Sequence, residues 1–159
     1  MSDYRIEWLN GEADLAGVME VDRESFNSPW TRAMYEQELR NTSQSFIAVL
    51  RTSAYAVAGY CAYRLVLDET QINNVAVRAK LRGRGYGRAL VAFTLEHGRT
   101  RGSSVAMLEV RRSNQVARRL YEGLGFLEVA VRSGCYANPV EDALVLVRNV
   151  RFLESNPTA

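Results

Sequence analysis

The sequence predicts a single α/β domain of mixed α+β type, in which a mostly antiparallel, twisted sheet is flanked by about four helices. Strand and helix patterns follow one another in the order β-α-α-β-β-β-α-β-α-β-β, without internal repeats or linkers. One strand–helix–strand unit, at about 70–110, requires a right-handed crossover and therefore a central parallel strand pair. A length of 159 residues suits one domain that buries about 70% of its unfolded surface.

The first half of the chain predicts an antiparallel meander with two helices. Residues 4–9 (YRIEWL) alternate apolar and polar side chains, as a half-buried strand does. Residues 10–26 carry Leu15, Val18 and Met19 at helical spacing, and Thr31 is placed to cap a second short helix. The other predicted elements are turns at 28–30 and 41–45 and a hairpin of strands at 46–50 and 55–67, joined by the RTSA turn.

The second half alternates strands and helices. A strand at 70–77 leads into a glycine-rich loop and then a helix at 86–102, which places Tyr86, Leu90 and Phe93 along one stripe. The predicted elements that follow are a strand at 104–110, a helix at 115–125, a strand at 126–132, an irregular loop at 134–142 and a final strand at 143–153. We therefore expect one domain over 1–153 and a frayed tail over 154–159.

Composition places the chain among ordinary globular proteins. Its net charge is +2, with 47% hydrophobic and 24% charged residues. The N-terminus lacks a signal-peptide pattern, and no apolar run approaches the roughly 18 residues that a membrane helix needs. We therefore expect a cytoplasmic protein with no membrane partner. Cys61 and Cys135 match no metal-ligand spacing, so both are expected to be reduced thiols and no metal is expected.

The stretch RGRGYGRAL, at 82–90, interleaves glycines with arginines immediately before the predicted helix. A helix N-terminus that opens from such a loop is suited to bind an anion through its backbone N–H groups. A nucleotide-binding P-loop is excluded because no lysine follows the glycines, and a dinucleotide fingerprint fits weakly because Arg88 occupies its third glycine position. A simple glycine-rich turn with solvated arginines is the structural alternative. The basic residues clustered here are Arg78, Lys80, Arg82, Arg84 and Arg88.

The run from Arg82 to Gly87 (RGRGYG) also matches the pattern [Q/R]-x-x-G-x-[G/A] of the GNAT superfamily, the acetyl-CoA-dependent N-acyltransferases. LEVRRSN at 108–114 resembles the family stretch LEVRxSN, and LYEGLGF at 120–126 resembles LYxxxGF. The resemblance covers about residues 4–152. It implies that the central parallel pair is splayed. FNSPW, VLDE at 66–69 and EDA at 141–143 make the chain similar to the ribosomal-protein-alanine N-acetyltransferases of the RimI type.

The resemblance implies that acetyl-CoA is the cosubstrate. The splayed strand would pair with the pantetheine arm, and the glycine loop would hold the pyrophosphate. A backbone N–H near Val77 would stabilise the oxyanion. Asn114 is carried over as a cofactor contact, although an asparagine there is also a common helix N-cap. The implied cofactor-binding residues are Val75, Ala76, Val77, Arg82, Gly83, Arg84, Gly85, Tyr86, Gly87, Arg88 and Asn114.

Glu109 and Tyr121 are the catalytic candidates. Glu109 emerges from the apolar strand MLEV, where desolvation would raise its pKa, and the resemblance makes it the proton acceptor, directly or through water. A solvent-facing strand glutamate is the alternative. Tyr121, in LYEGLGF, would protonate the leaving thiolate, and a core tyrosine packed beside Leu120 and Leu124 is its alternative.

The substrate implied by the resemblance is the N-terminal alanine of a small-subunit ribosomal protein. The acidic pairs Asp68–Glu69 and 141–142 would suit a basic peptide, although both are equally well explained as solvated loop ends. The substrate candidates are Trp30, Asp68, Glu69 and Tyr136. Cys135 stands where the family often has a second aromatic residue beside Tyr136, so the chain departs from the family pattern in the loop that would line the peptide groove.

Two other functions remain open at this stage. The same fold would serve an acetyltransferase that acts on lysine, a polyamine or another small amine, since related enzymes modify those acceptors. A non-catalytic module would bind coenzyme A or nucleic acid through the basic cluster at 78–88. That second function leaves Glu109 and Tyr121 without a role, so no direct nucleic-acid contact is expected.

Overall fold

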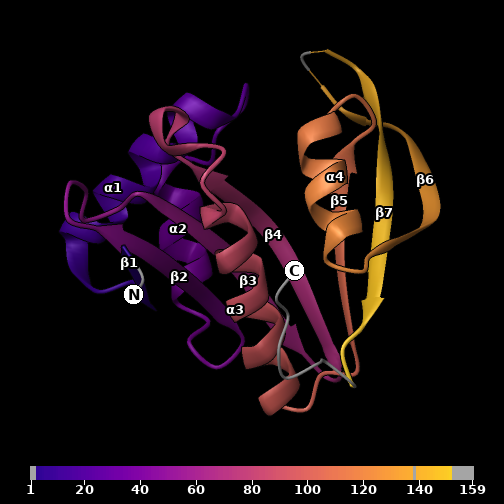
Figure 1. Ribbon diagram of the computed structural model, residues 1–159, viewed down its shortest axis with the longest axis horizontal. Coiled ribbons are helices and arrows are strands. Elements are labelled where there is room, and N and C mark those ends of the chain that lie inside the picture. The colour runs from indigo at the N-terminus through magenta and orange to yellow at the C-terminus, as the bar shows by residue number, and fades with distance from the viewer. Residues whose placement is uncertain (1–2, 138, 152–159) are drawn as a thin grey trace.

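A computed structural model describes residues 3–137 and 139–151 of the chain (Figure 1). Within these residues a seven-stranded sheet has the order β1-β2-β3-β4-β5-β7-β6. The elements are β1 (Tyr4–Trp8), α1 (Gly11–Ser25), α2 (Arg32–Leu39), β2 (Ser45–Thr52), β3 (Gly59–Val66), β4 (Glu69–Val77), η1 (Ala79–Leu81), α3 (Tyr86–Thr100), β5 (Val105–Arg111), α4 (Gln115–Gly123), β6 (Leu127–Tyr136) and β7 (Glu141–Asn149). This confirms the predicted fold class and element order, whereas the predicted tail at 154–159 lies outside the described residues.

The sheet is antiparallel except at its centre. Strands β1 to β4 form the predicted meander, and β5, β7 and β6 form a second antiparallel group. The groups meet where β4 pairs with β5 in parallel, joined by the crossover through α3. In Figure 1, β4 and β5 lie together at their first residues and move apart toward their carboxyl ends.

The separation of β4 from β5 begins at a β-bulge. Pairing with β3 shifts from Tyr63↔Ile72 to Ala62↔Asn74, so Asn73 is the extra residue. Pairing with β5 stops at the same level, at Ile72↔Leu108. Because a bulge bends its strand and increases the local twist, the end of β4 turns away from β5. The backbone edge of β4 beyond Ile72 therefore faces a gap rather than a partner strand.

Two hydrophobic clusters cover the two faces of the sheet. On one face, α1 and α2 contribute buried Val18, Val21 and Tyr35, which pack with side chains of β2 and β3. On the other face, α3 and the region around α4 contribute Leu90 and Phe126 to a cluster that includes side chains of β5 and β7. Burying an apolar side chain stabilises the fold by roughly 1.5–3 kcal/mol. The helices packed on the two faces therefore hold β4 and β5, and the gap between them, in place.

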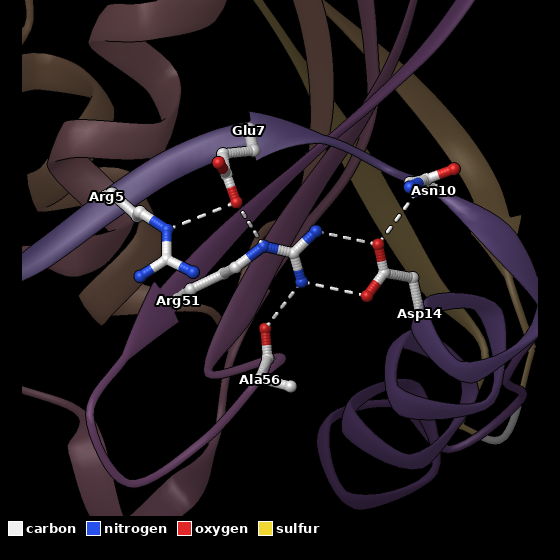
Figure 2. Close-up of polar contacts among 6 residues, drawn as sticks. All are labelled: Arg5, Glu7, Asn10, Asp14, Arg51 and Ala56. Carbon is white, nitrogen blue, oxygen red and sulfur yellow. Dashed lines mark hydrogen bonds and ion pairs between the residues drawn. The ribbon is translucent and has the colours of Figure 1, made fainter.

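Helix α1 is joined to the sheet by an ion pair as well as by apolar packing. Figure 2 shows the Arg51 guanidinium of β2 between the carboxylates of Asp14 and Glu7. Arg51 donates to both oxygens of Asp14, at 2.8 and 2.7 Å, and also to the Ala56 carbonyl. The Asp14 and Arg51 side chains are only 9% and 12% exposed, so this is a nearly buried, two-point contact.

Several predicted boundaries are corrected by the structure. β3 begins at Gly59, later than predicted, because the Tyr55 carbonyl instead closes a turn with the Thr52 N–H at 3.0 Å. The predicted irregular loop is largely strand: β6 continues to Tyr136, which pairs with Glu141. The predicted cap of α2 is confirmed, since Thr31 Oγ1 accepts from the Met34 N–H at 3.2 Å. Across the described residues, no helix is long and apolar enough to cross a membrane.

Candidate active site

The separated end of β4 supplies backbone hydrogen-bonding groups. The Arg78 N–H donates to the Ala58 carbonyl at 2.9 Å, on the β3 side. Because backbone groups alternate sides along a strand, the N–H and C=O of Val77 turn toward the gap. The Val77 carbonyl there accepts from Arg82 Nε at 3.1 Å. This strand end can therefore pair with an extended ligand and still present the Val77 N–H to a developing negative charge.

A cleft of about 500 Å³ occupies the gap. It is bounded by the end of α1, the end of β4, the glycine loop with the start of α3, and one face of α4. The predicted site residues that line it are Val75, Ala76, Val77, Arg82, Gly83, Gly85, Tyr86, Gly87, Arg88, Asn114 and Tyr121. The structure thus brings together side chains and backbone groups from distant segments, but it leaves exposed Arg84 outside the cleft lining.

The glycine loop has the conformation that its sequence predicts. Gly83 and Gly85 have φ values of +80° and +84°, in the region where L-residues with side chains are strained. Gly85 is the N-cap of α3, so the first N–H groups of the helix and its positive dipole end lie at the cleft. Arg82 fixes the loop by donating to the Val77 carbonyl and to Ser25 Oγ, at 3.1 and 3.2 Å. The loop is therefore suited to bind an anionic group through its backbone.

Tyr86 contributes its backbone rather than its ring. Its side chain is buried, and its hydroxyl donates to Asp3 Oδ2 at 2.7 Å. The ring lies edge-on to Tyr4, with 5.6 Å between centroids. The aromatic group thus anchors α3 to the start of β1, and the N–H of Tyr86 is the part of the residue placed to meet a ligand.

Helix α4 brings Asn114 and Tyr121 to the cleft. Asn114 Oδ1 caps the helix by accepting from the Ala117 N–H at 3.1 Å, so the capping alternative holds for this side chain. Tyr121 is buried, and its ring meets Phe126 edge-on with centroids 5.7 Å apart. Burial raises the pKa of Tyr121 well above its usual value. The phenol therefore stays protonated and is able to donate a hydrogen bond, whereas complete proton loss becomes less favourable.

Glu109 does not lie in the apolar enclosure that the sequence predicted. Alternation along β5 directs Leu108 and Val110 to the core and Glu109 to the opposite face, where its side chain is 30% exposed. The carboxylate makes an ion pair with Arg132 of β6, and Oε2 lies 3.4 Å from Cys135 Sγ. The groups next to the Glu109 carboxylate are therefore the Arg132 guanidinium and the Cys135 thiol.

Tyr136, a predicted substrate contact, is partly buried at the end of β6. Burial raises the pKa of Tyr136, and the nearby Glu109 carboxylate adds to the effect. The Arg111 guanidinium lies over the Tyr136 ring, 4.4 Å from its centroid. Of the two catalytic candidates, Tyr121 lines the cleft, whereas Glu109 lies outside its lining, as does Tyr136.

The two acidic pairs are not part of an open rim around the cleft. Glu141 Oε2 accepts from the Ser113 N–H at 2.6 Å, and Glu141 and Asp142 face Arg111 and Arg112. Asp68 and Glu69 lie at the opposite end of β4, roughly 20 Å from Val75 at about 3.3 Å per residue. The structure does not bring Asp68 and Glu69 to the cleft, because the parallel pair is joined at that end of the sheet.

Sequence reasoning missed part of the cleft wall. Ser25 and Phe26 line it from the end of α1, and Val116 and Leu120 line it from α4. Val116 is 79% exposed, so its apolar side chain borders the open cleft. Phe26 stands in the FNSPW stretch, but Trp30 of that stretch lies outside the cleft lining and packs on Tyr35 with 5.1 Å between ring centroids.

The chain is similar to known acetyltransferases in sequence and in structure. Residues 15–126 match the profile of the acetyltransferase (GNAT) family. A Salmonella typhimurium protein named ribosomal protein bS18-alanine N-acetyltransferase is 31% identical over 135 residues, which cover 84% of this chain and 89% of that protein. The crystal structure of the ribosomal-protein-S18-alanine N-acetyltransferase from Escherichia coli matches with a TM-score of 0.85 and 27% identity, covering 96% and 97% of the two chains.

A third similarity concerns the fold alone. The crystal structure of a NatC complex bound to Gag peptide and CoA contains a chain that matches with a TM-score of 0.81 and 23% identity, covering 93% of this chain and 99% of that one. The splayed strands, the glycine loop at the start of α3 and the match over most of the sequence lead to one assignment. The chain belongs to the acetyltransferase (GNAT) family.

Proposed function

We propose that this protein transfers an acetyl group from acetyl-CoA to the N-terminal α-amine of alanine in ribosomal protein bS18. The observation that carries the reaction is the cleft between β4 and α4, which has the glycine loop at one end and Tyr121 in its wall. The choice of bS18 as the acceptor is supported by the relatives in Salmonella and Escherichia coli, which are named ribosomal protein bS18-alanine N-acetyltransferases. We assign the activity to one domain, residues 1–153, in the cytoplasm.

The residues of the cleft fit acetyl-CoA, which supplies an acetyl thioester when bound. The N–H groups at the start of α3 would hold its pyrophosphate, and the unpaired edge of β4 at Val75–Val77 would hold the pantetheine arm. The Val77 N–H would stabilise the oxyanion. Tyr121 would donate a hydrogen bond to the leaving sulfur, and its buried position excludes water from that bond.

Glu109 would accept the proton of the attacking amine, directly or through water. An α-amine has a reference pKa of about 7.7–8.0 and a lysine side chain one of about 10.4, so neutralising lysine at pH 7 costs about 3.5 kcal/mol more than neutralising the α-amine. The single, partly exposed carboxylate of Glu109 suits the α-amine, which is the easier of the two groups to deprotonate. This is why the proposal names an α-amine ahead of a lysine or a polyamine.

The predicted basic peptide and the absence of direct nucleic-acid contact remain part of the proposal. Arg78 of the basic cluster donates to Glu20 and to the Val57 carbonyl, both within the protein. Arg82 is likewise engaged at Val77 and Ser25. These internal contacts of Arg78 and Arg82 argue against a nucleic-acid-binding surface. A basic acceptor would give a peptide KM that rises with salt, whereas a nucleic-acid module would show a steep salt dependence of RNA affinity.

Mass spectrometry of acetyl transfer tests the proposal. The acceptor is the N-terminal peptide of the host's bS18 with a free alanine, and the comparison peptide has a blocked N-terminus and an internal lysine. We expect acetylation of the free alanine alone, lost in Glu109→Gln and kept in Glu128→Gln, the same change at an exposed site on β6. Acetylation of the lysine peptide would move the acceptor to side-chain amines, and acetyl-CoA binding without any transfer would contradict the catalytic proposal.

A further inference from the structure

The stretch EDA at 141–143 has no part in the reaction described so far. Its two carboxylates lie at the start of β7, next to the turn that joins β5 to α4. Glu141 Oε2 accepts from the Ser113 N–H at 2.6 Å, and the Glu141 side chain is only 16% exposed. A carboxylate that accepts from a backbone N–H makes a strong, charge-assisted hydrogen bond. Glu141 is therefore bonded directly to the backbone that leads into α4.

This bond continues the pairing of β5 with β7 past the end of the strand. The last residue of β5, Arg111, pairs with Ala143, and the N–H of the residue after it donates to the Asp142 carbonyl at 3.2 Å. The next N–H along the chain is that of Ser113, which donates to Glu141. A side chain thus takes the place of a backbone carbonyl at the point where the two strands stop pairing.

The turn after β5 needs such a contact because of the gap beside it. Pairing of β5 with β4 stops at Leu108, and the cleft occupies the gap beyond that residue. Among the described residues, the strand that pairs with β5 past Leu108 is β7. The helix that follows the turn lines the cleft with residues from Asn114 to Tyr121. The position of that wall therefore depends on how the turn is fixed to β7.

Glu141 is itself held in place by Arg111. Arg111 Nη1 donates to Glu141 Oε1 at 3.3 Å. The same guanidinium donates to the Ala137 and Pro139 carbonyls in the β6–β7 turn, at 2.8 and 3.1 Å. Hydrogen bonds from Ser113, together with the contact to Arg111, lower the pKa of Glu141, so its carboxylate stays ionised at neutral pH. The Ser113 N–H thus meets a charged acceptor that is already fixed.

The charge of Glu141 does not help to bind an anionic ligand. A carboxylate repels the phosphate groups of acetyl-CoA, so removal of the charge alone would favour binding. The Glu141 side chain does not line the cleft. A contribution of Glu141 to the site therefore acts through the Ser113 N–H and the α4 wall.

We propose that Glu141 is a positioning residue for acetyl-CoA: its carboxylate fixes the Ser113 N–H and thereby holds the start of α4 as the cleft wall across from β4. The inference rests on the proposed function for the identity of the ligand. The fixing of the turn is a separate structural statement, which is tested without any ligand. Glu141 acts through Ser113 and Asn114 and does not touch the reacting atoms.

The test variants are Glu141→Ala and Glu141→Gln. Both remove the same charge, but glutamine keeps a side-chain oxygen that can accept from the Ser113 N–H. Glu141→Val also removes the acceptor and introduces a residue that favours strands, which protects the experiment if Glu141→Ala does not fold. Asp142→Ala is the matched control, because Asp142 is the neighbouring carboxylate of β7 and its side chain accepts instead from the Gly134 N–H of β6 at 3.0 Å.

The first readout is amide hydrogen exchange of Ser113 in the free enzyme, followed by NMR. We expect exchange to accelerate about tenfold in Glu141→Ala and Glu141→Val, because Ser113 is exposed and its N–H loses its acceptor. Glu141→Gln should change the rate by less than about threefold, since the hydrogen bond is kept in neutral form. Asp142→Ala should accelerate exchange at Gly134 and leave Ser113 unchanged. Unchanged exchange at Ser113 in both Glu141→Ala and Glu141→Val would overturn the inference, whatever ligand the protein proves to bind.

The second readout is the dissociation constant of coenzyme A, measured by isothermal titration, together with kcat and the acetyl-CoA KM. We expect Glu141→Ala to raise the dissociation constant and KM about fivefold, since binding must then order a loosened turn. Glu141→Gln should stay within about twofold of the wild type. In both variants kcat should be kept, because Tyr121 is fixed by its packing on Phe126. A variant that is only less stable would instead lower the apparent kcat and keep KM.

Three outcomes separate the inference from its alternatives. Equal affinity for coenzyme A in Glu141→Ala and Asp142→Ala would overturn the positioning role. An equal loss in Glu141→Ala and Glu141→Gln would also overturn it, because these variants share the loss of charge and differ in the hydrogen bond. Coenzyme A binding by the wild type without acetylation of any peptide would refute the proposed function and leave the result for Glu141 standing.

Discussion

At the scale of single residues, the contact between Glu109 and Arg132 governs access to the proposed base. Period-2 alternation sends the Glu109 side chain away from the core, where it meets a guanidinium that is 61% exposed. An incoming ammonium group is the same kind of partner as that guanidinium. Under the proposed function, an acceptor ammonium group would compete with Arg132 for the Glu109 carboxylate.

Arg132→Gln should lower the peptide KM by about threefold, because the variant removes an exposed cation that competes with the acceptor amine for Glu109. The acetyl-CoA KM should not change, since Arg132 lies outside the cleft lining. Steady-state kinetics with each substrate varied in turn measure both constants. Arg99→Gln, which removes an exposed ion pair with Glu96 on α3, is the control. A higher peptide KM would mean that Arg132 binds the acceptor instead.

Several features of these residues could not be predicted from the sequence. Glu109 was expected in an apolar setting because its chain neighbours are apolar, but alternation in a strand separates neighbours onto opposite faces. Arg132 is brought to it only by the register of β6 on β7 and of β7 on β5. The hydrogen-bond partners of Asp22 could not be predicted either, since Tyr35 and Tyr60 come from other elements.

At the scale of elements, the site is made by the end of one strand and the start of one helix. The hydrophobic pattern predicted both β4 and α3, and the glycines between them predicted an anion-binding turn. The pattern could not predict where β4 leaves β5, because the bulge at Asn73 is a property of strand pairing and not of residue type. The family resemblance, rather than periodicity, supplied the expectation of a splayed pair.

Gly85→Ala should raise the acetyl-CoA KM by about tenfold and leave the peptide KM nearly unchanged. An alanine held at a φ of +84° costs about 1–2 kcal/mol, and relief of that strain would turn the first N–H groups of α3 away from the anion. Isothermal titration with coenzyme A and steady-state kinetics measure the effect.

Gly102→Ala is the matched control for that change. Gly102 has a φ of +98° and, like Gly85, has open space where an added Cβ would lie, but it is placed beyond the other end of α3. Both variants should lose similar stability in a urea titration, and only Gly85→Ala should lose affinity for coenzyme A. Equal affinity in the two variants would show that the loop conformation is not what binds the anion.

At the scale of the whole molecule, the two faces of the sheet have different tasks. The face covered by α3 and α4 carries the glycine loop and Tyr121, whereas the face covered by α1 and α2 supports the cleft wall that includes Phe26. The order of elements and the crossover were predictable because they follow from hydrophobic periodicity and connection rules. The position of Asp68 and Glu69 could not be predicted, since it depends on which end of β4 is hydrogen-bonded to β5.

The Asp14–Arg51 pair should make the stability of the whole domain depend on acid pH. Hydrogen bonds from Arg51 lower the pKa of Asp14, so the stabilisation is fully present above the unfolded pKa of about 3.9 and is lost as pH falls through the lower folded value. Asp14→Asn should reduce the unfolding free energy by about 3 kcal/mol at pH 7, as expected for a broken buried pair. That difference should shrink in urea titrations carried from pH 7 to pH 3. Glu12→Gln, at an exposed pair with Arg32, should change little at any pH, and a pH-independent loss in Asp14→Asn would show that the charge of Asp14 is not what joins α1 to the sheet.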